Sequence, residues 1–428
     1  MSGAEKRLVV YIAMDDTDHP EIGCTTYHFH QMLERISTRV EDFAVVERRL
    51  VRLWPFAPKR TRGNAALAAV CSLSEKNLQL LSESVQDFHH ALLDEIESTY
   101  PVDEHSPQPT LILADQILPE HWYWDSVRGY VDWRDRLTAA NGSFISVHST
   151  STPIGIVGAS SAIAWSPDAD STWELIAWRK AEAVGTERCV SSTAIVEMER
   201  QHPGTFANRD PTAGRGLIAP RTPCPVLYGI RGDSEAIVDA AHRFLQARDD
   251  VERSENHAVH RTNQVSDHHL LGSHAGTVLS AVEETQGGHA SLVVYDGERI
   301  HRLVAFSESG PVNRLLRNFV IGDMVEWVGL PSPEDGAIHL ERLRLVELVP
   351  RTSTRPSCCD RSMRSAGSEQ PLRCLTCGAT HGKVWIVRTT LQHGESNHQG
   401  WVEPTPSNRR HLAKPLDRGL PQLAKNQD

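Results

Sequence analysis

Three carboxylates within four positions are the residues of this chain best placed to do chemistry. The stretch "MDDTDHPEIGCTT" puts Asp15, Asp16 and Asp18 directly after the apolar run "RLVVYIA", and two threonines follow. Magnesium prefers oxygen ligands and commonly bridges one or two carboxylates to the phosphates of a substrate. This acidic loop therefore predicts a magnesium site at the C-terminal end of a first strand. An Asp-rich turn with threonine caps is the structural alternative.

A helical pattern begins where the acidic loop ends. Phe29, Leu33 and Ile36 recur at helical spacing, and Thr25 or Thr26 is a natural N-cap. The backbone N–H groups at the start of a helix bind phosphate readily, and the threonine hydroxyls lie beside them. The sequence thus predicts that a metal-bound nucleotide and a hydroxyl acceptor meet at this strand, loop and helix.

A basic loop, "PKRTRGNAA", follows the next predicted strand. It carries Lys59, Arg60 and Arg62, with Asn64 after them. Arginine forks match phosphate oxygens bidentately and spread the charge that develops in phosphoryl transfer. If this loop faces the acidic loop, the two form an ATP site without the Walker sequence G-x-x-x-x-G-K-[ST], which occurs nowhere in the chain. A surface loop without a ligand is the alternative.

Half of the eight cysteines fall within twenty residues, namely Cys358, Cys359, Cys374 and Cys377. Clustered cysteines in a large cytosolic chain more often bind metal than form disulfides. The pair Cys374-x-x-Cys377 is a sound zinc knuckle, whereas Cys358 and Cys359 are adjacent and lack the usual two-residue spacing. Asp360 or His381 is a candidate to complete the shell. The pattern favours a degenerate zinc site over a metal-free remnant.

Length and composition limit the class of protein. With 428 residues the chain exceeds the roughly 250 at which single cores stop growing, so we expect several modules. A hydrophobic content of 39% and a charged content of 23% exclude a disordered chain and a membrane-spanning one. No apolar run reaches the roughly 20 residues that a spanning helix needs, and no signal-peptide pattern is present. We therefore expect a cytoplasmic protein with no membrane partner and no evident protein partner.

The net charge of −11 is unevenly distributed along the chain. Residues 351–428 hold twelve Lys and Arg against six Asp and Glu, which leaves residues 1–350 with a charge of about −17. A basic tail on an acidic body indicates a polyanionic partner, although a solvated charged tail is the alternative. Aromatic and basic residues in "KVWIVRTT" and "RRHLAKPL" suit stacking and phosphate contacts with an unpaired RNA strand.

The order of expected elements predicts a multidomain α/β and α+β fold. Alternating strands and helices over residues 1–145 favour an α/β or α+β domain, and residues 146–255 suit a ferredoxin-like module. Residues 249–269 are polar and are the best linker candidate. Short strands with Gly or Asp turns over residues 256–350 are typical of a small barrel, and residues 351–428 form a C-terminal segment with the cysteines and the basic tail.

An ordered set of motifs runs through nearly the whole chain. It comprises "DDTD", "GCTTY", "RLWPFAPKRTRGNAA", "TWELIAWR", "TFANRD", "PVLYGIRG", "TNQVSDHH", the cysteine cluster and "RRHLAKPL". In this order the motifs resemble the archaeal tRNA(Ile) 2-agmatinylcytidine synthetase family. The resemblance implies four parts, which are a kinase-like ATP-binding domain, a ferredoxin-like domain, an OB-fold that binds nucleic acid and a zinc ribbon.

The resemblance also implies a reaction. It implies an ATP-dependent ligase that joins agmatine to C2 of the wobble cytidine, in the anticodon loop of the minor isoleucine tRNA. ATP is split to AMP and phosphate, the cytidine O2 is activated by phosphorylation, and agmatine displaces that phosphate to give 2-agmatinylcytidine. Decoding then changes from AUG to AUA. By position, the resemblance implies catalytic, metal-binding and phosphate-binding roles for Asp15, Asp16, Asp18, Thr25, Arg60, Arg62 and Asn64, with Thr25 as a phosphate acceptor.

Agmatine carries a cationic guanidinium, so its pocket should hold a carboxylate. Glu174 in "TWELIAWR" and Asp210 in "TFANRD" are the candidates, and either could instead form a structural ion pair. The chain also departs from the family pattern, most visibly at Arg60, which stands where a lysine is expected. The departures and the incomplete first knuckle bear on zinc and RNA binding more than on the phosphoryl chemistry.

One alternative function belongs to a different class. In it, the chain is a single-stranded nucleic-acid-binding protein without catalysis, whose barrel and basic tail bind the strand. The acidic and basic loops discriminate between the two functions, because a binding protein has no need of "DDTD" facing "RTRGN".

Overall fold

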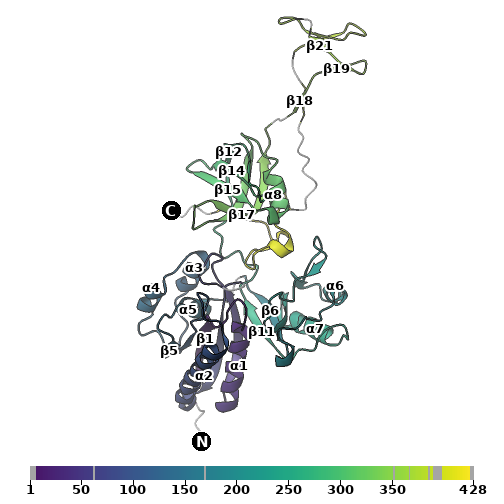
Figure 1. The fold of residues 1–428 in the computed structure, drawn as a ribbon. Coiled ribbons are helices and arrows are strands. Elements are labelled where there is room, and N and C mark those ends of the chain that lie inside the picture. Colours follow the sequence, from purple (N-terminus) through teal and green to yellow (C-terminus); the bar gives the residue numbers. More distant parts are fainter. Residues whose placement is uncertain are drawn as a thin grey trace. The chain divides into compact units, whose positions relative to one another are not determined.

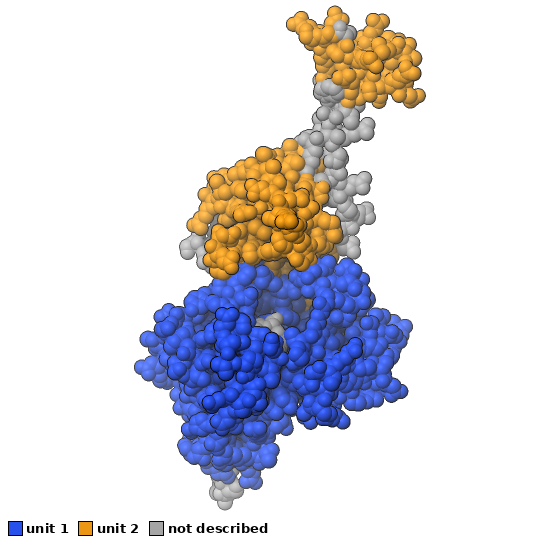
Figure 2. Space-filling view, viewed as in Figure 1, with its two compact units in different colours: residues 1–271, 405–415 blue, residues 272–404, 416–428 orange. Residues whose placement is uncertain are grey.

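The computed structural model of the chain forms two compact units (Figures 1 and 2). Unit 1 comprises residues 1–271 and 405–415, and unit 2 comprises residues 272–404 and 416–428. The residues that the structure describes are 6–60, 63–167, 170–349, 352–365, 367–383, 386–388 and 398–424. Within these ranges, the helices are all too short or too polar to cross a membrane. The chain thus leaves unit 1 after residue 271, returns to it for residues 405–415, and then leaves it again.

Unit 1 is built on one nine-stranded sheet, in which β2 and β11 are the one parallel pair among the described neighbours. In sheet order the strands are β5 (Ser146–Ser149), β4 (Thr110–Ala114), β1 (Arg7–Asp15), β3 (Ala65–Ser74), β2 (Ala44–Arg52), β11 (Asn256–Thr262), β6 (Thr172–Trp178), β10 (Val226–Gly232) and β7 (Thr205–Phe206). Two short strands, β8 (Arg209–Asp210) and β9 (Arg215–Gly216), pair separately.

Helices cover both faces of the N-terminal half of this sheet, which explains why β1 is apolar along most of its length. The helices of unit 1 are α1 (Thr25–Arg39), α2 (Leu78–Thr99), α3 (His121–Arg128), α4 (Trp133–Ala139), α5 (Ile156–Ala164), α6 (Ser192–Gln201) and α7 (Glu235–Gln246). Ile12 and Met14 of β1 lie in a core with residues of α1 and α2, and Ala13 between them lies in a second core with residues of α3 and α5. The predicted first strand and first helix are confirmed.

The second half of the sheet has its own core. Residues of α6 and α7 pack with β6 and β10, and Leu175, Leu227 and Ile230 are fully buried there. Figure 1 shows α6 and α7 side by side next to β6. Leu175 lies opposite Ile230 in the antiparallel pairing of β6 with β10, so the two strands present one apolar face to both helices.

Two expectations about domain edges are wrong. We expected residues 249–269 to form a linker and residues 256–262 to belong to the barrel, but β11 pairs with β2 and β6 within unit 1. We also expected residues after 145 to begin the second module, but β5 pairs with β4 and α5 packs against the N-terminal half of the sheet. In the first case the polar composition wrongly indicated an exposed linker, because the polar side chains of His260 and Thr262 in β11 are buried.

Unit 2 contains a small closed barrel, as the short strands predicted. Its sheet runs β12 (His274–Val278), β16 (Met324–Pro331), β17 (Ile338–Glu347), β15 (Ile300–Ala305), β14 (Ala290–Tyr295) and β13 (Glu283–Glu284), and an additional β12–β14 pairing closes five of these strands. Helix α8 (Pro311–Leu316) supplies Val312 and Leu316 to the barrel core, where they pack with Trp327.

The cysteine-bearing part of unit 2 consists of short strands. They are β18 (Thr352–Thr354), β19 (Ser357–Cys358), β20 (Arg361–Ser362), β21 (Arg364–Ser365), β22 (Leu372–Arg373), β23 (Thr380–His381) and β24 (Ile386–Arg388). Its described core is small and contains Met363, Leu372 and Cys374. A core of this size provides little stabilisation, so bonds among the cysteines or to a metal have more weight here than in the barrel.

Candidate active site

The acidic loop lies at the end of β1, beside the start of α1. The strand ends at Asp15, and Asp16 follows with a φ of 58°, so that its backbone N–H donates to Asp15 Oδ1 at 2.8 Å. The Thr25 hydroxyl donates to Asp18 Oδ1 at 3.1 Å. Because Cys24 is the N-cap of α1, neither threonine has the capping role that we expected. The Thr25 hydroxyl instead faces the acidic loop.

Burial and mutual repulsion disfavour the charged forms of these carboxyl groups. Burial, followed by the charge of Asp16, raises the pKa of Asp15 well above its usual value. Burial and the charge of Asp18 raise the pKa of Asp16 to about 7. The Oδ2 atom of Asp16 is buried without a hydrogen-bond partner. An orphaned carboxylate oxygen next to two further carboxyl groups is a donor set that suits a hard divalent cation, so these residues fit magnesium.

Two glycines at the start of α5 make room for Asp15. A β-carbon at Gly158 would collide with the Asp15 carboxylate, and one at Gly155 would lie 3.0 Å from the Asp15 carbonyl oxygen. The absence of side chains at these positions lets α5 pack directly onto the end of β1. The close approach also excludes water from one side of Asp15, which contributes to the burial of its carboxyl group.

The basic loop and the acidic loop line one cavity of about 330 Å³, the main cavity. Lys59, Arg60 and Asn64 belong to its lining. Arg60 donates from Nη1 to the Ala57 carbonyl at 2.7 Å, and Asn64, with a φ of 45°, donates from Nδ2 to the Trp54 carbonyl at 2.7 Å. These local bonds hold the two ends of the loop in place. Arg62, which the sequence also singled out, lies outside the described residues.

Glu174 lines the main cavity, but its carboxylate is already paired. It lies 3.1 Å from Arg231 Nε and 3.5 Å from Arg52 Nη2, and its side chain is 3% exposed. Gln264 also donates to it, and Gly229 on the neighbouring strand leaves the space that the carboxylate fills. A guanidinium ligand could reach Glu174 only by displacing one of the two arginines.

Asp210 does not line the main cavity. Its Oδ1 accepts from the backbone N–H of Thr212 at 2.9 Å and from the Thr212 hydroxyl at 2.6 Å, and its Oδ2 accepts from the Ser407 backbone N–H at 3.1 Å. These hydrogen bonds outweigh its burial and hold the pKa of Asp210 below its usual value. Asp210 therefore fixes the returning segment 405–415 to unit 1.

A carboxylate that the sequence analysis missed faces the main cavity. Glu104 lines it, its side chain is 88% exposed, and it pairs loosely with His105 at 3.7 Å. Its loop is held by Asp103, which accepts from the His105 backbone N–H at 2.7 Å and contacts His19 Nε2 at 3.1 Å. Among the described carboxylates of the lining outside the acidic loop, Glu104 is the more accessible one, because Glu174 is buried between arginines.

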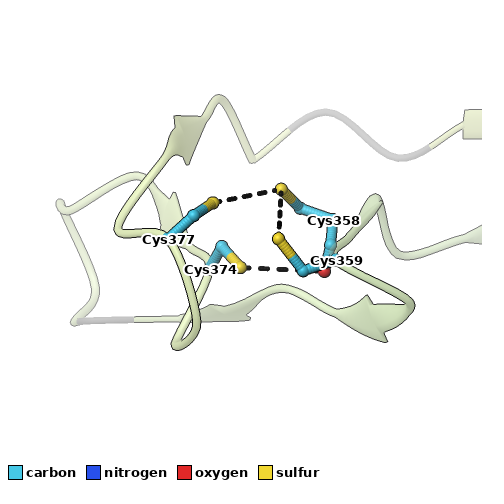
Figure 3. A group of neighbouring side chains, drawn as sticks. All are labelled: Cys358, Cys359, Cys374 and Cys377. Atoms are coloured by element: carbon cyan, nitrogen blue, oxygen red, sulfur yellow. Dashed lines mark hydrogen bonds between the residues drawn. The ribbon is translucent and has the colours of Figure 1, made fainter.

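The four clustered cysteines converge in unit 2 (Figure 3). One sulfur atom from each of Cys358, Cys359, Cys374 and Cys377 lies within 4.8 Å of all the others. The adjacent pair can converge because Cys359 and Asp360 both have a positive φ, of 50° and 58°, between the paired strands β19 and β20. A two-residue turn of this kind brings the flanking strands into register, and the sulfur atoms of Cys358 and Cys359 lie 3.9 Å apart. Backbone N–H groups of Cys377 and Thr376 lower the pKa of Cys374 to about 6, whereas hydrogen bonding with Cys377 raises the pKa of Cys358 and of Cys359, so Cys374 is the thiol of these three that is favoured as a thiolate, the form that binds metal.

Comparison with known proteins places this arrangement in a family. The TiaS TCKD domain model matches residues 11–152, and the TiaS FLD domain model matches residues 154–269. The isoleucine-tRNA 2-agmatinylcytidine synthetase TiaS of Methanopyrus kandleri is 31% identical, with 95% of this chain and 96% of that protein covered. The protein of the same name from Archaeoglobus fulgidus is 30% identical, with 96% and 97% covered. This chain belongs to the TiaS family.

Solved TiaS structures share the fold. The crystal structure of apo TiaS superposes with a TM-score of 0.83 at 28% identity, covering 96% of this chain and 98% of that one. The complex of TiaS with its isoleucine tRNA and ATP gives a TM-score of 0.82 at 27% identity, covering 98% and 100%. The complex of TiaS with the same tRNA, AMPCPP and agmatine gives 0.79 at 25% identity, also covering 98% and 100%. The likeness to TiaS therefore extends over nearly the whole chain.

The main cavity of this chain is lined in part by residues that no local motif connects. Arg52, Arg231 and His411 line it together with the acidic loop, and they come from β2, from β10 and from the segment 405–415. Each lies inside a motif that we had quoted for the resemblance, namely "RLWPF", "PVLYGIRG" and "RRHLAKPL", and the last of these also as a candidate RNA contact. The order of the motifs along the chain could thus have identified these three residues as candidate site residues, whereas the spacing of residue types could not.

Proposed function

We propose that this chain conjugates agmatine to C2 of the wobble cytidine of the minor isoleucine tRNA, with ATP as the energy source. One observation carries the proposal. Carboxylates, a basic loop and a threonine hydroxyl line a single cavity, in a chain that spans nearly the full length of enzymes named for this reaction. Relatives crystallised with the isoleucine tRNA, ATP and agmatine support the same substrates for this chain.

We further propose the ligase class, with AMP and phosphate as products of ATP: one of the two phosphoryl groups passes to the cytidine O2, and the other passes to the Thr25 hydroxyl, from which water releases it as phosphate. The cytidine O2 is a poor leaving group, and phosphorylation turns it into a phosphate ester that an amine can displace at C2. The C2–O2 bond breaks as the C2–N bond forms, phosphate takes the bonding electrons, and the attacking amine loses a proton to the departing phosphate or to water. The protein's part is to position the reactants and to neutralise the charge on the transferred phosphoryl group.

In this proposal Asp15, Asp16 and Asp18 hold magnesium, which supplies charge neutralisation to the phosphates when bound. The buried, unpartnered Oδ2 of Asp16 supports this role. Thr25 is the phosphate acceptor, and its hydrogen bond to Asp18 orients the hydroxyl toward the acidic loop. Arg60, Arg62 and Asn64 form the phosphate-binding loop, and Lys59 adds a positive charge to the same lining.

The agmatine guanidinium needs a carboxylate, and accessibility favours Glu104. Glu174 stays a candidate only if the ligand displaces Arg52 or Arg231, and Asp210 is engaged by backbone N–H groups outside the cavity lining. The exposed carboxylate of Glu104 requires no such displacement, because its single described ion pair joins it loosely to His105.

We propose the finer architecture on the same grounds. Unit 1 combines a kinase-like and a ferredoxin-like domain, the five-stranded barrel is an OB-fold, and the cysteine-bearing part is a zinc ribbon with Cys358, Cys359, Cys374 and Cys377 as ligands. The convergence of four sulfur atoms supports zinc, because four cysteines match the tetrahedral preference of that ion. A cytoplasmic location stays a prediction from the sequence.

Mass spectrometry of tRNA nucleosides tests the proposed function. Purified protein is incubated with the minor isoleucine tRNA, ATP, magnesium and agmatine, and the tRNA is digested. We expect one cytidine to gain the mass of agmatine minus that of water. Reactions without ATP and with a cytidine-to-uridine change at the wobble position are the controls. Binding of tRNA without any product would overturn the proposal in favour of a nucleic-acid-binding protein without catalysis.

A further inference from the structure

A second pocket, of about 480 Å³, adjoins the main cavity. We call it the basic pocket. The two share a wall that includes Arg52, Arg60, Gly63 and His411, while Arg410 and Leu412 line the basic pocket alone. All of these residues belong to unit 1. A group bound in the basic pocket would therefore lie one side chain away from the main cavity.

The returning segment 405–415 is firmly built into unit 1. The backbone N–H groups of Val265 and Asp267 donate to the carbonyl oxygens of His411 and Leu412, both at 2.9 Å. Leu412 is 2% exposed and packs in the core beside α3 and α5. The position of Arg410 and His411 against the basic loop is therefore a property of the fold and not of a loose tail.

The charges of the two spaces differ. The main cavity mixes acidic and basic side chains, whereas the described lining of the basic pocket holds Arg60, Arg410 and Arg52, of which Arg52 also pairs with Glu174 at 3.5 Å, and contains no carboxylate. The guanidinium of Arg410 stacks over the Phe56 ring at 4.7 Å, which orients its planar fork. A pocket with oriented arginines and no acid suits an oxyanion.

His411 lines both the main cavity and the basic pocket, and its ring is suited to contact an anion. The positive charges of Arg52 and Arg231 hold the pKa of His411 well below its usual value. Its ring reaches the shared wall closely, because a β-carbon at Gly63 would lie 3.0 Å from His411 Cδ2. A neutral imidazole adds no repulsion to the arginines and can donate a hydrogen bond to a phosphate oxygen.

We propose that the basic pocket binds a phosphodiester group of the RNA substrate and thereby holds an adjoining nucleotide with its base in the main cavity. This site rests on the proposed function, since it assumes that RNA is the substrate. The phosphates of ATP share the required chemistry, but they travel with magnesium and need the carboxylates that the basic pocket lacks. A phosphodiester carries one negative charge and needs no metal, so it matches this lining better.

The salt dependence of tRNA binding tests the site in the full-length protein. For Arg410→Gln we expect the slope of log K against log salt concentration to become shallower by about 0.7 to 1, as for the loss of one phosphate contact. We expect tRNA affinity to fall several-fold at low salt, with ATP affinity in magnesium unchanged. Arg410→Lys keeps the charge and should retain most of the slope.

The control is Arg243→Gln, which removes an arginine on α7 whose side chain is 71% exposed and should leave the slope unchanged. Matching unfolding midpoints for all three variants exclude misfolding as the cause. If Arg410→Gln loses ATP affinity while the salt slope of tRNA binding stays unchanged, the pocket belongs to the nucleotide and the proposal is overturned. The proposal is also overturned if Arg410→Gln changes neither the ATP affinity nor the salt slope. A shallower slope in a protein that forms no agmatine product would refute the proposed function but keep the RNA site.

Discussion

Asp16 combines a left-handed backbone, a buried oxygen without a partner and a raised pKa at the end of β1. Each feature costs stability in the absence of a cation, and together they indicate a residue kept for binding. The sequence could predict this part of the candidate site, because Asp15, Asp16 and Asp18 are neighbours in the chain. It could not predict Glu104, since only the fold brings that residue to the lining of the main cavity.

Replacing Asp16 with asparagine should stabilise the protein when no divalent cation is present. Folding raises the pKa of Asp16 from near 4 to about 7, so the folded state loses stability as the pH rises through this window, and the loss is constant above it. Asp16→Asn removes that loss. We expect its unfolding midpoint to exceed that of the wild type by a few degrees at pH 8 and by less at pH 5.

Magnesium provides the second half of this test. It should raise the midpoint of the wild type at pH 8 and not that of Asp16→Asn, so that the two converge, and the variant should lose ATP cleavage while tRNA binding persists. Asp115→Asn, at an exposed carboxylate after β4, is the matched control and should behave as the wild type. Retained ATP cleavage in Asp16→Asn would contradict the metal assignment.

Glu104→Gln should weaken agmatine binding without slowing the chemical step. Removing one accessible partner of a guanidinium costs about 1.4 kcal/mol, so we expect the KM for agmatine to rise about tenfold at constant kcat. Glu97→Gln, at an exposed position on α2, is the control. If KM stays unchanged in Glu104→Gln but rises in Glu174→Gln, the guanidinium displaces an arginine at Glu174 instead.

At the scale of elements, the sequence did not predict the joint between the two halves of the sheet, which is the pairing of β2 with β11. β2 and β11 pair through only two residue pairs, Arg49 with Arg261 and Leu50 with Thr262. Beyond β11, the side chain of Asn263 continues the ladder in place of a backbone. The polar residues around Asn263 indicated a linker. The local sequence does not reveal that Asn263 pairs with Arg52, which lies 211 residues away in the chain.

Asn263→Ala should destabilise unit 1 by about 2–4 kcal/mol. The Asn263 side chain accepts from the Arg52 backbone N–H at 2.7 Å and donates to the Arg52 carbonyl and the Tyr123 hydroxyl, each at 2.8 Å. Asn263 is fully buried, so its loss leaves buried polar groups unsatisfied. Urea unfolding measures the change, and Asn256→Ala, at the exposed start of β11, should cost less than about 0.5 kcal/mol. Equal effects of the two variants would contradict the role of Asn263 in the joint.

At the scale of the whole molecule, the chain does not end in one C-terminal module. The sequence grouped residues 351–428 by charge and cysteines, but residues 405–415 cluster with unit 1. The mixed composition of "RRHLAKPL" does not show that this segment belongs to unit 1. The burial of Leu412 and the hydrogen bonds of the segment with Val265 and Asp267 depend on residues that are distant in the sequence. A deletion of residues 351–428 therefore alters unit 1 as well as the cysteine-bearing part.

Two deletions should separate these contributions. Removing residues 405–428 takes away Leu412 from the core and the Ser407 contact of Asp210, so we expect a lower unfolding midpoint and loss of ATP cleavage. Replacing residues 352–388 by a short Gly/Ser linker removes six basic residues against two acidic ones. For that variant we expect an unchanged midpoint of unit 1, weaker tRNA binding and a shallower salt slope. If it binds tRNA with the full slope, the cysteine-bearing part does not contact the RNA backbone, and the salt dependence must come from the rest of the chain, including the basic pocket.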